Sequence, residues 1–555
     1  MFIFSNEIEF KKKFSELDNP LGIVINSSSS LPSEAANKLS LWLKKKDADL
    51  LTRIREFRGT IADHVEAFFN RASIEDKKKL FSYSSKVILS IEKYAEIQQI
   101  FLIHAFLKKN RSSRLVIFCD DREINDLLAN IFLKKKRFHL ALPSIYAWLR
   151  FIRTLLRVSF SHQSKINANR VILTLAKTFP LTSRDNYFGD LPVALCKDNS
   201  TAIISICAGK QILFNKKSTI IPLESFSHIT DVLNAWIKTI SQSFLVTLER
   251  SKPNQDLFFY ELSRFIKNKE IRSGSFFYNS FLSSSFQRLF FKLAPSTLIY
   301  PFENRSWEKS LLRSAYKAHC LDTVGYQHSS ITPRHLSLKI SKDQFNTKEF
   351  PKRIITVGDI TYNWLKKNSP MIANRLIIGG SLRKIQTKPP LPKSRGILVA
   401  ISSSFYEAKR MLLTLSEAAK AIDIPVIIRS HPTIDIEALY NSLNWSQNVI
   451  LSKDRDLLQD IKDSHVIIYS SSTVAIEGML SGRLPIFLNI GDCPSGDPLL
   501  GRATYNVSSV KEIKSVLNSI NNMTKVNFKK MQRQAIKFAQ SYLKDIEPEE
   551  FLNLL

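Results

Sequence analysis

Several features that would assign a chain to a familiar class are scarce in this sequence of 555 residues. The five cysteines lie far apart and form no CxxC pair; they are Cys119, Cys196, Cys207, Cys320 and Cys493. That spacing is typical of neither a disulfide framework nor a zinc knuckle, so it indicates a reducing compartment. The 15 glycines and 21 prolines are too few for a glycine-rich array or a proline-rich stalk.

Long hydrophobic runs are also missing. No stretch of 18 uninterrupted apolar residues occurs, so the sequence predicts no membrane-spanning helix. The first residues, MFIFSNEIEFKKKF, contain acids and no long apolar segment, which is not the pattern of a signal peptide. We therefore expect a cytoplasmic protein.

Acidic residues are the minority charge. Lys and Arg number 80 against 50 for Asp and Glu, which gives a formal net charge of +30. Such an excess favours an anionic partner, namely nucleic acid, a nucleotide or an anionic membrane surface. The lysine runs in the first 165 residues are scattered and belong to no recognised nucleic-acid-binding module. A nucleic-acid-binding protein stays an alternative that charge alone favours, and no nucleic-acid partner is expected.

The last third of the chain alternates short apolar runs with helical patterns. Strands are predicted at residues 396–402, 425–432, 448–452, 465–470 and 484–488, with helices at 405–422, 435–443, 454–464 and 473–482 between them. Near-continuous apolar strands separated by helices predict a parallel, doubly wound sheet, so the fold class is α/β.

A similar alternation precedes the proline-rich segment KPPLPKSRG (388–396), which is the predicted linker. Four predicted units follow: a basic, mostly helical region (1–165), which either stands alone or belongs to the first Rossmann-like half; a Rossmann-like acceptor domain (166–387); a Rossmann-like donor domain (388–525); and a C-terminal helix (526–555).

Polar side chains end two strands of the predicted donor domain. Arg429 and His431 follow one strand, and Ser470, Ser471, Ser472 and Thr473 follow another and open a helix. In an open parallel sheet, ligands bind at the carboxyl ends of strands, and a helix N-terminus attracts phosphate. His431 could donate a hydrogen bond to that phosphate, and Glu477 could reach a ribose hydroxyl. The alternatives are a simple helix cap and a strand terminator.

Together, the SHP motif and YSSSTVAIEGMLSGRLPIFL (469–488) resemble the C-terminal domain of GT-B glycosyltransferases that build bacterial surface polysaccharides. Bacterial sialyltransferases, Kdo transferases and CDP-glycerol glycerophosphotransferases carry similar elements. The segment from Tyr300 to Leu338 also resembles the N-terminal half of surface carbohydrate biosynthesis proteins. The resemblance covers roughly residues 295–500.

This resemblance implies a GT-B fold, two Rossmann-like domains with a central cleft, and transfer of a sugar from a nucleotide-sugar donor. The favoured donor is a CMP-activated sugar acid, and the acceptor is a glycan or lipid-linked glycan of lipopolysaccharide or capsule. His431 and the four hydroxyl residues would bind the donor phosphate. The resemblance implies an inverting reaction that needs neither metal nor cofactor. A polyol-phosphate transferase using CDP-glycerol and a nucleotide-sugar 2-epimerase are alternatives.

The acceptor base is expected on the other domain. Glu303 follows a predicted strand, so its carboxylate could deprotonate the acceptor hydroxyl. The rival base is His328, since teichoic acid polymerases carry a histidine in a similar position. The alternative for Glu303 is an acid that simply stabilises a helix N-terminus, and for His328 a structural loop histidine. Near the predicted joint, Arg383 could contact the donor or only pack at the hinge.

The segment IYAWLRFIRTLLRV (145–158) predicts an amphipathic helix. Arg150, Arg153 and Arg157 share one face, and the opposite face is apolar. This pattern is typical of a helix lying on a membrane surface, but equally of one packed on a domain with solvated arginines. With the net charge, it favours peripheral attachment to the anionic inner membrane. The Phe-rich segment 275–294 could line an acceptor-lipid groove or belong to the core.

Overall fold

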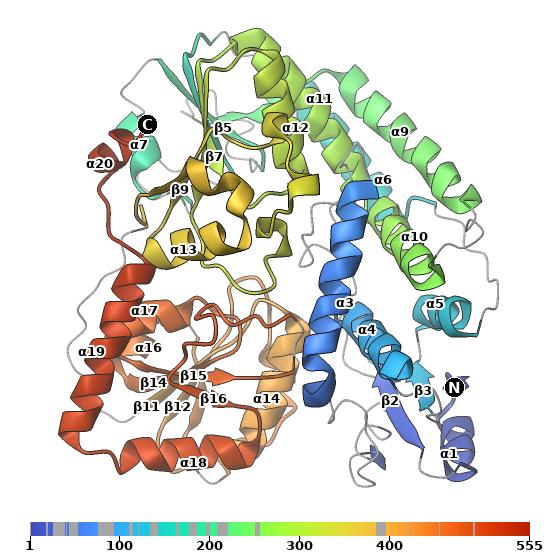
Figure 1. Ribbon diagram of the computed structural model, residues 1–555, viewed down its shortest axis with the longest axis vertical. Coiled ribbons are helices and arrows are strands. Elements are labelled where there is room, and N and C mark those ends of the chain that lie inside the picture. Colours follow the sequence, from blue (N-terminus) through green and yellow to red (C-terminus); the bar gives the residue numbers. More distant parts are fainter. Residues whose placement is uncertain are drawn as a thin grey trace.

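The computed structural model describes residues 2–17, 20–25, 39, 42–43, 54–75, 81, 94–109, 115–119, 121–133, 142–161, 166–176, 185, 187–195, 200–207, 220–249, 256–383, 396–420, 422–453, 455–491 and 494–555. These residues form three parallel sheets with helices packed around them (Figure 1). Most of the predicted linker, 388–395, lies outside the described residues.

The middle domain is built on a sheet of seven strands. They are β4 (Arg170–Thr174), β5 (Thr201–Ser205), β6 (Ile220–Pro222), β7 (Thr297–Pro301), β8 (Asp322–Gln327), β9 (Arg353–Thr356) and β10 (Leu376–Ile378). Their spatial order is β6-β5-β4-β7-β8-β9-β10, and every neighbouring pair is parallel. The order reverses between β4 and β7, which is the switch point of a Rossmann-like sheet.

Helices cover both faces of this sheet. They include α6 (Ile145–Phe160), α7 (Leu191–Leu195), α9 (Ile229–Leu248), α10 (Leu257–Arg272), α11 (Ser275–Leu293), α12 (Ser306–Lys317) and α13 (Asp359–Asn368). The Phe-rich segment forms α11, and its phenylalanines Phe276, Phe277, Phe281, Phe286 and Phe290 are buried. Of the two roles that the sequence left open for this segment, core packing is the one these five residues perform: Phe276 belongs to the core shared with the N-terminal unit and the other four to the core of the middle domain. Phe291 of the same helix is exposed.

The C-terminal domain carries a second parallel sheet. Its strands are β11 (Gly396–Ala400), β12 (Val426–Arg429), β13 (Val449–Leu451), β14 (Ser464–Tyr469), β15 (Leu484–Leu488) and β16 (Tyr505–Val507), in the order β13-β12-β11-β14-β15-β16. The helices are α14 (Phe405–Ala419), α15 (Glu437–Asn441), α16 (Leu457–Lys462), α17 (Val474–Leu480) and α18 (Val510–Asn521). This order again reverses once, between β11 and β14.

These two sheets confirm the predicted α/β class with two Rossmann-like, doubly wound domains. Inner strands such as β11, β14 and β15 are short, mostly apolar runs that are buried on both faces, as a parallel sheet requires. The cleft predicted between the domains stays a prediction.

The N-terminal unit contains a third, smaller sheet that the sequence analysis missed in part. Strands β1 (Phe2–Phe4), β3 (Leu115–Cys119) and β2 (Leu21–Ile25) pair in parallel, beside α1 (Glu7–Ser15), α3 (Ile54–Glu75), α4 (Tyr94–Lys109) and α5 (Arg122–Phe132). Of these strands, the sequence predicts only one, from the apolar run RLVIFCDD (114–121), which contains β3. The core of this unit joins the middle domain, because Phe68 and Phe101 pack against Phe259 and Phe258 of α10.

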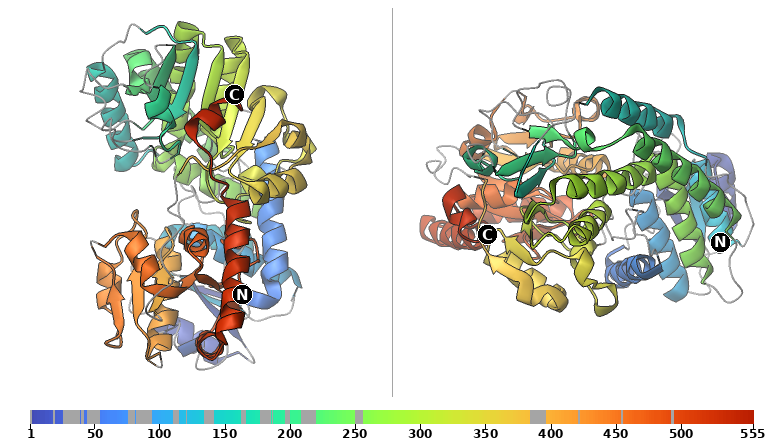
Figure 2. Two further views of the ribbon diagram at one scale, coloured as in Figure 1. Left: turned by 90° about the vertical axis from the view of Figure 1, so that its left-hand side faces the viewer. Right: turned by 90° about the horizontal axis from the view of Figure 1, so that it is seen from above.

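The end of the chain returns to the middle domain. Helix α19 (Lys525–Tyr542) packs on α17 and α13, and the short α20 (Pro548–Leu552) then lies on the middle domain (Figure 2). Phe551 is fully buried, and its ring centroid lies 5.1 Å from that of Tyr326. Gly358 is required here, because a Cβ atom would lie 2.5 Å from the carbonyl oxygen of Tyr542. None of the helices described in this chain is long and apolar enough to cross a membrane.

Candidate functional site

The predicted donor residues gather at the carboxyl edge of the C-terminal sheet. His431 follows β12, and residues 470–473 follow β14. The sequence analysis expects these two strand ends to be neighbours, but β11 lies between them, followed by Ser402. This order places residues 470–473 at the switch point between β11 and β14, where ligands bind in such sheets.

The imidazole of His431 is prepared to donate a hydrogen bond. Its Nδ1 accepts the backbone N–H of Thr433 at 3.3 Å and lies 2.7 Å from the Thr433 hydroxyl oxygen. Burial lowers the pKa of His431 below its ordinary value, so the ring is neutral near pH 7. With Nδ1 acting as acceptor, the single ring proton is on Nε2. That N–H can donate to an anionic oxygen.

The hydroxyl residues after β14 have distinct roles. Ser470 and Ser472 are buried, and the Ser471 hydroxyl donates to Glu407 Oε2 at 2.5 Å, with Ser402 Oγ 2.8 Å away. Thr473 occupies the N-cap position of the seven-residue α17, but its side chain makes no cap hydrogen bond. Capping therefore does not account for Thr473, whose hydroxyl stays available at the sheet edge.

Arg429 and Glu477 occupy the flanks of this edge. Arg429 Nη1 donates to the fully buried Asp460 at 2.8 Å and to the carbonyl oxygen of Arg455 at 2.9 Å. Asp460 also accepts from Ser452. Burial raises the pKa of the Glu477 carboxyl, against the opposing charges of Arg383 and Arg429. Arg429 is thus tied to its own domain, while burial favours the neutral form of the Glu477 carboxyl.

Glu303 and His328 lie together at the carboxyl edge of the middle sheet, after β7 and β8. His328 Nε2 is 3.6 Å from Glu303 Oε1, and Arg305 forms an ion pair with the same carboxylate. Burial acts to raise the pKa of Glu303, but Arg305 and two histidines outweigh it, so this pKa falls below its ordinary value. Burial lowers the pKa of His328 to about 4. At neutral pH the pair is a carboxylate beside a neutral imidazole.

The rest of this cluster escaped sequence reasoning. His335, whose Nδ1 accepts the Thr332 N–H at 2.9 Å, and Tyr187, whose ring centroid lies 4.5 Å from that of His328, both surround Glu303. Arg383 links the two halves electrostatically, because its charge acts on the pKa of His328 in one domain and of Glu477 in the other. The structure therefore brings Arg383 near residues of both predicted sites.

A buried ion pair joins the two domains directly beside Ser471. Arg334, in the segment after β8, pairs with Glu407 of α14, the same carboxylate that Ser471 contacts. Both side chains are buried, and Arg334 Nε also donates to the carbonyl oxygen of Pro494 at 3.2 Å. Arg334 outweighs burial and lowers the pKa of Glu407. No sequence signal marks Glu407, which lies in an ordinary amphipathic helix.

Comparisons with known proteins identify no family for this chain. No family model matches it, and no curated protein does. Solved structures that resemble it include MurG of Acinetobacter baumannii (12% identity, 70% of this chain and 99% of that one, TM-score 0.38) and the apo lipopolysaccharide outer core galactosyltransferase WaaB (11%, 69% and 98%, TM-score 0.37). A putative UDP-N-acetylglucosamine 2-epimerase from Listeria monocytogenes is similar to the same degree (10%, 70% and 95%, TM-score 0.38). Similarities with these low TM-scores and identities assign neither a family nor an activity to this chain.

The sequence contains two acidic motifs, at residues 120–122 and 454–456, that have structural roles in the described residues. Asp121, from the segment 120–122, caps α5 by accepting the N–H groups of Glu123 and Ile124. Asp456, from the segment 454–456, caps α16. The first residue of each motif lies outside the described part. Over the described ranges, no group of three or more His, Cys, Asp or Glu side chains is arranged to hold a metal ion.

Proposed function

We propose that this protein is a glycosyltransferase that moves a sugar from a nucleotide-activated donor to a surface glycan such as lipopolysaccharide or capsule. The observations that carry the proposal are two groups of polar side chains at strand ends: a neutral histidine with hydroxyls in the C-terminal domain, and a carboxylate with a neutral imidazole in the middle domain. The favoured donor is a CMP-activated sugar acid, because the SHP and SSS motifs resemble enzymes that use such donors.

The reaction is an inverting displacement. The acceptor hydroxyl gives its proton to Glu303, or to His328, as its oxygen attacks the anomeric carbon. The bond from that carbon to the donor phosphate oxygen breaks, and the electron pair leaves with the nucleotide. His431 donates its Nε2 proton as a hydrogen bond to the departing phosphate, with the hydroxyls of residues 470–473 beside it. Glu477 contacts the ribose.

Nucleotide binding tests this donor site. Thermal melting with CMP, CDP, UMP, UDP and GDP should give a shift with one base, since a ligand at 100 times its Kd stabilises by about 2.7 kcal/mol. His431→Ala should weaken binding roughly tenfold or more, because it removes a hydrogen bond to a charged group. His228→Ala, an exposed histidine of the other domain, is the matched control. Stabilisation by none of the nucleotides would contradict the proposal, and CDP-glycerol turnover would favour the polyol-phosphate alternative.

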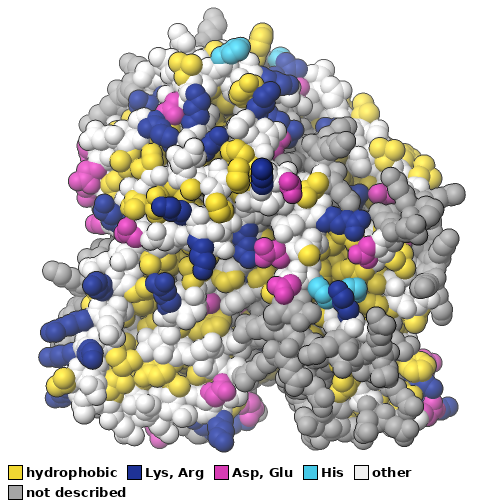
Figure 3. Space-filling model, viewed as in Figure 1, with side chains coloured by type: hydrophobic (Ala, Val, Ile, Leu, Met, Phe, Trp, Pro, Cys, Tyr) yellow, Lys and Arg dark blue, Asp and Glu magenta, His cyan; other side chains and the backbone are white. Residues whose placement is uncertain are grey.

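We also propose that the protein works at the anionic inner face of the membrane. Helix α6 turns its apolar face outward, so that Trp148, Leu149 and Ile152 are exposed. Helix α9 packs beside it and exposes a second apolar row: Ile229, Leu233, Ile237, Phe244, Leu245 and Leu248. Hydrophobic side chains lie at the surface along α9 in Figure 3. We call these two rows of exposed apolar residues the apolar stripes.

A further inference from the structure

A cavity of about 220 Å³ opens at the switch point of the middle sheet. Leu175 lines it after β4, Ile206 and Cys207 after β5, and Arg305 after β7. Helices α6 and α11 close its other side with Arg150 and Tyr278. The carboxyl ends of strands at a switch point are where open α/β sheets bind ligands, so the position alone favours a ligand site. None of the lining residues except Arg305 belongs to the sites described above.

One of the two positive charges of this cavity lacks a counter-charge among the described residues. Within the described part of the chain, its lining contains two arginines and no acid. Arg305 is neutralised by its ion pair with Glu303. Arg150, in contrast, has no carboxylate partner among the described residues, and its guanidinium lies only against the ring of Tyr278, at 4.9 Å from the centroid. Burial lowers the pKa of Arg150 below its ordinary value. A partly buried cation of this kind is stabilised by an anion.

The other two arginines of α6 provide the contrast. Arg157 Nε lies 2.6 Å from Glu224 Oε1, so its charge is already paired. Arg153 is exposed to solvent. Among the three, only Arg150 faces a cavity without a counter-charge. The unpaired arginine is therefore a property of this position and not of the helix as a whole.

We propose that this cavity binds an anionic group of the acceptor, a phosphate or a carboxylate, with Arg150 as its cationic partner. The assignment deepens the proposed function and rests on it, because it names the chemical class of the acceptor. Arg305 lines the cavity and also pairs with Glu303. Only the Arg305 side chain therefore stands between an acceptor bound at Arg150 and the proposed base. Tyr278, whose hydroxyl donates to the Ile206 carbonyl at 2.7 Å, holds the guanidinium in place.

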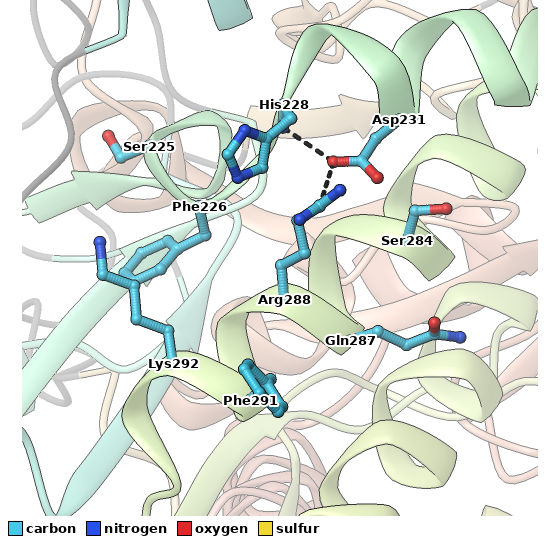
Figure 4. Close-up of a pocket in the computed structure, with 9 residues that line it drawn as sticks. All are labelled: Ser225, Phe226, His228, Asp231, Ser284, Gln287, Arg288, Phe291 and Lys292. Atoms are coloured by element: carbon cyan, nitrogen blue, oxygen red, sulfur yellow. Dashed lines mark hydrogen bonds and ion pairs between the residues drawn. The ribbon is translucent and has the colours of Figure 1, made fainter.

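A larger cavity, of about 820 Å³, is a weaker candidate. It lies at the start of α9 and the end of α11 and is drawn in Figure 4. There Arg288 Nε is 2.5 Å from Asp231 Oδ2, and Asp231 also accepts the backbone N–H of His228. Its arginine is thus already compensated, and the cavity does not lie at the strand ends.

Binding of simple anionic sugars tests the inference. Glucuronate carries the carboxylate and glucose 6-phosphate the phosphate, while glucose is the neutral control. We expect calorimetry to detect binding of one of the two anions, with an affinity that falls roughly tenfold or more in Arg150→Gln. Arg153→Gln, one turn along the same helix, should bind like the wild type. Equal affinity in wild type and Arg150→Gln, equal binding of glucose, or no binding of either anion would overturn the inference.

A second measurement needs no substitution and cannot be lost to misfolding. Cys207 lines the cavity and is partly exposed, whereas Cys119 and Cys320 are buried. Alkylation of Cys207 by iodoacetamide, followed by peptide mass spectrometry, should slow several-fold when the binding anion is present and be unchanged with glucose. An unprotected Cys207 would contradict the inference. Nucleotide melting decides the proposed function separately: nucleotide binding without anion binding leaves that function standing and removes only this assignment.

Discussion

Glu303 and His328 share one buried environment, yet each is shifted toward the unprotonated form. Burial alone favours the neutral form of each, which for His328 gives a pKa of about 4. For Glu303 the charge of Arg305 reverses the effect of burial, so the carboxylate is retained. Glu303 is also the more accessible of the two, since 21% of its side chain is exposed against 6% for His328. We therefore favour Glu303 as the base.

This assignment predicts a particular pattern of activity. Glu303→Gln should lower kcat/KM roughly 10²- to 10⁴-fold, because it removes the proton acceptor. His328→Asn should have a smaller effect, since it removes a neighbour and not the base. Because both pKa values lie below their ordinary values, the acid limb of kcat/KM should lie below the ordinary pKa of a glutamate, with no titration near the ordinary pKa of a histidine. Steady-state kinetics over pH with both variants is the measurement. A larger loss in the His328 variant would make histidine the base.

Sequence reasoning located these residues but not their partners. His431, Glu303 and His328 each follow a strand, and strand ends are visible in the apolar pattern. Arg334 and Glu407 are 73 positions apart in the chain and meet only because two domains pack together. No local pattern encodes such a contact. The surroundings of Arg150 could not be predicted from the sequence for the same reason, because its guanidinium lies against Tyr278, which belongs to another helix.

At the scale of elements, the five strands predicted in the last third are all present, although the one predicted at 425–432 ends three residues earlier and β16 was missed. Strand β15 coincides with the predicted range 484–488, because its apolar run is bounded by polar or glycine residues. Strands β1 and β2 were missed: β1 has three residues, and neither stands out from a helical, lysine-rich context. Helix α6 was predicted correctly as a helix, but two of its arginines contact the domain and its apolar face is exposed. Periodicity gives the faces of a helix and not the direction in which each one points.

The ion pair between the segment after β8 and α14 predicts a strong stability effect. Arg334→Met should lower the free energy of unfolding by about 3–5 kcal/mol, because it leaves the buried Glu407 carboxylate without its cation. Urea unfolding measures this change. Donor-nucleotide affinity should fall as well, since Glu407 holds Ser471.

The matched control removes both charges. Arg334→Met combined with Glu407→Leu leaves no buried charge unpaired, so most of the lost stability should return. Arg313→Met, which removes a partly exposed arginine 3.8 Å from Glu349, should cost under about 1 kcal/mol. A double variant no more stable than Arg334→Met would show that the pair acts through something other than charge.

For the whole molecule, the net charge of +30 and the apolar stripes both favour binding to an anionic membrane surface. Helix α6 contains no acid, and the one acid within α9, Asp231, is buried against Arg288. The charged side chains that these helices expose, Arg153 and Lys238, are both basic. An anionic bilayer matches this combination: apolar side chains enter the interface while cations meet lipid phosphates. A protein partner bound to these helices would not require that all their exposed charges be positive.

The last prediction follows from this match. The protein should sediment with phosphatidylglycerol vesicles and less with phosphatidylcholine vesicles, and added salt should weaken the binding. Leu149→Ser with Ile237→Ser should reduce vesicle binding at least tenfold, since each side chain contributes about 1.5–3 kcal/mol when buried. Val526→Ser on α19 removes an even more exposed apolar residue outside the stripes and should change nothing. Vesicle binding that survives the double variant, or steep salt-dependent binding to random DNA in its place, would argue that the charge serves a different partner.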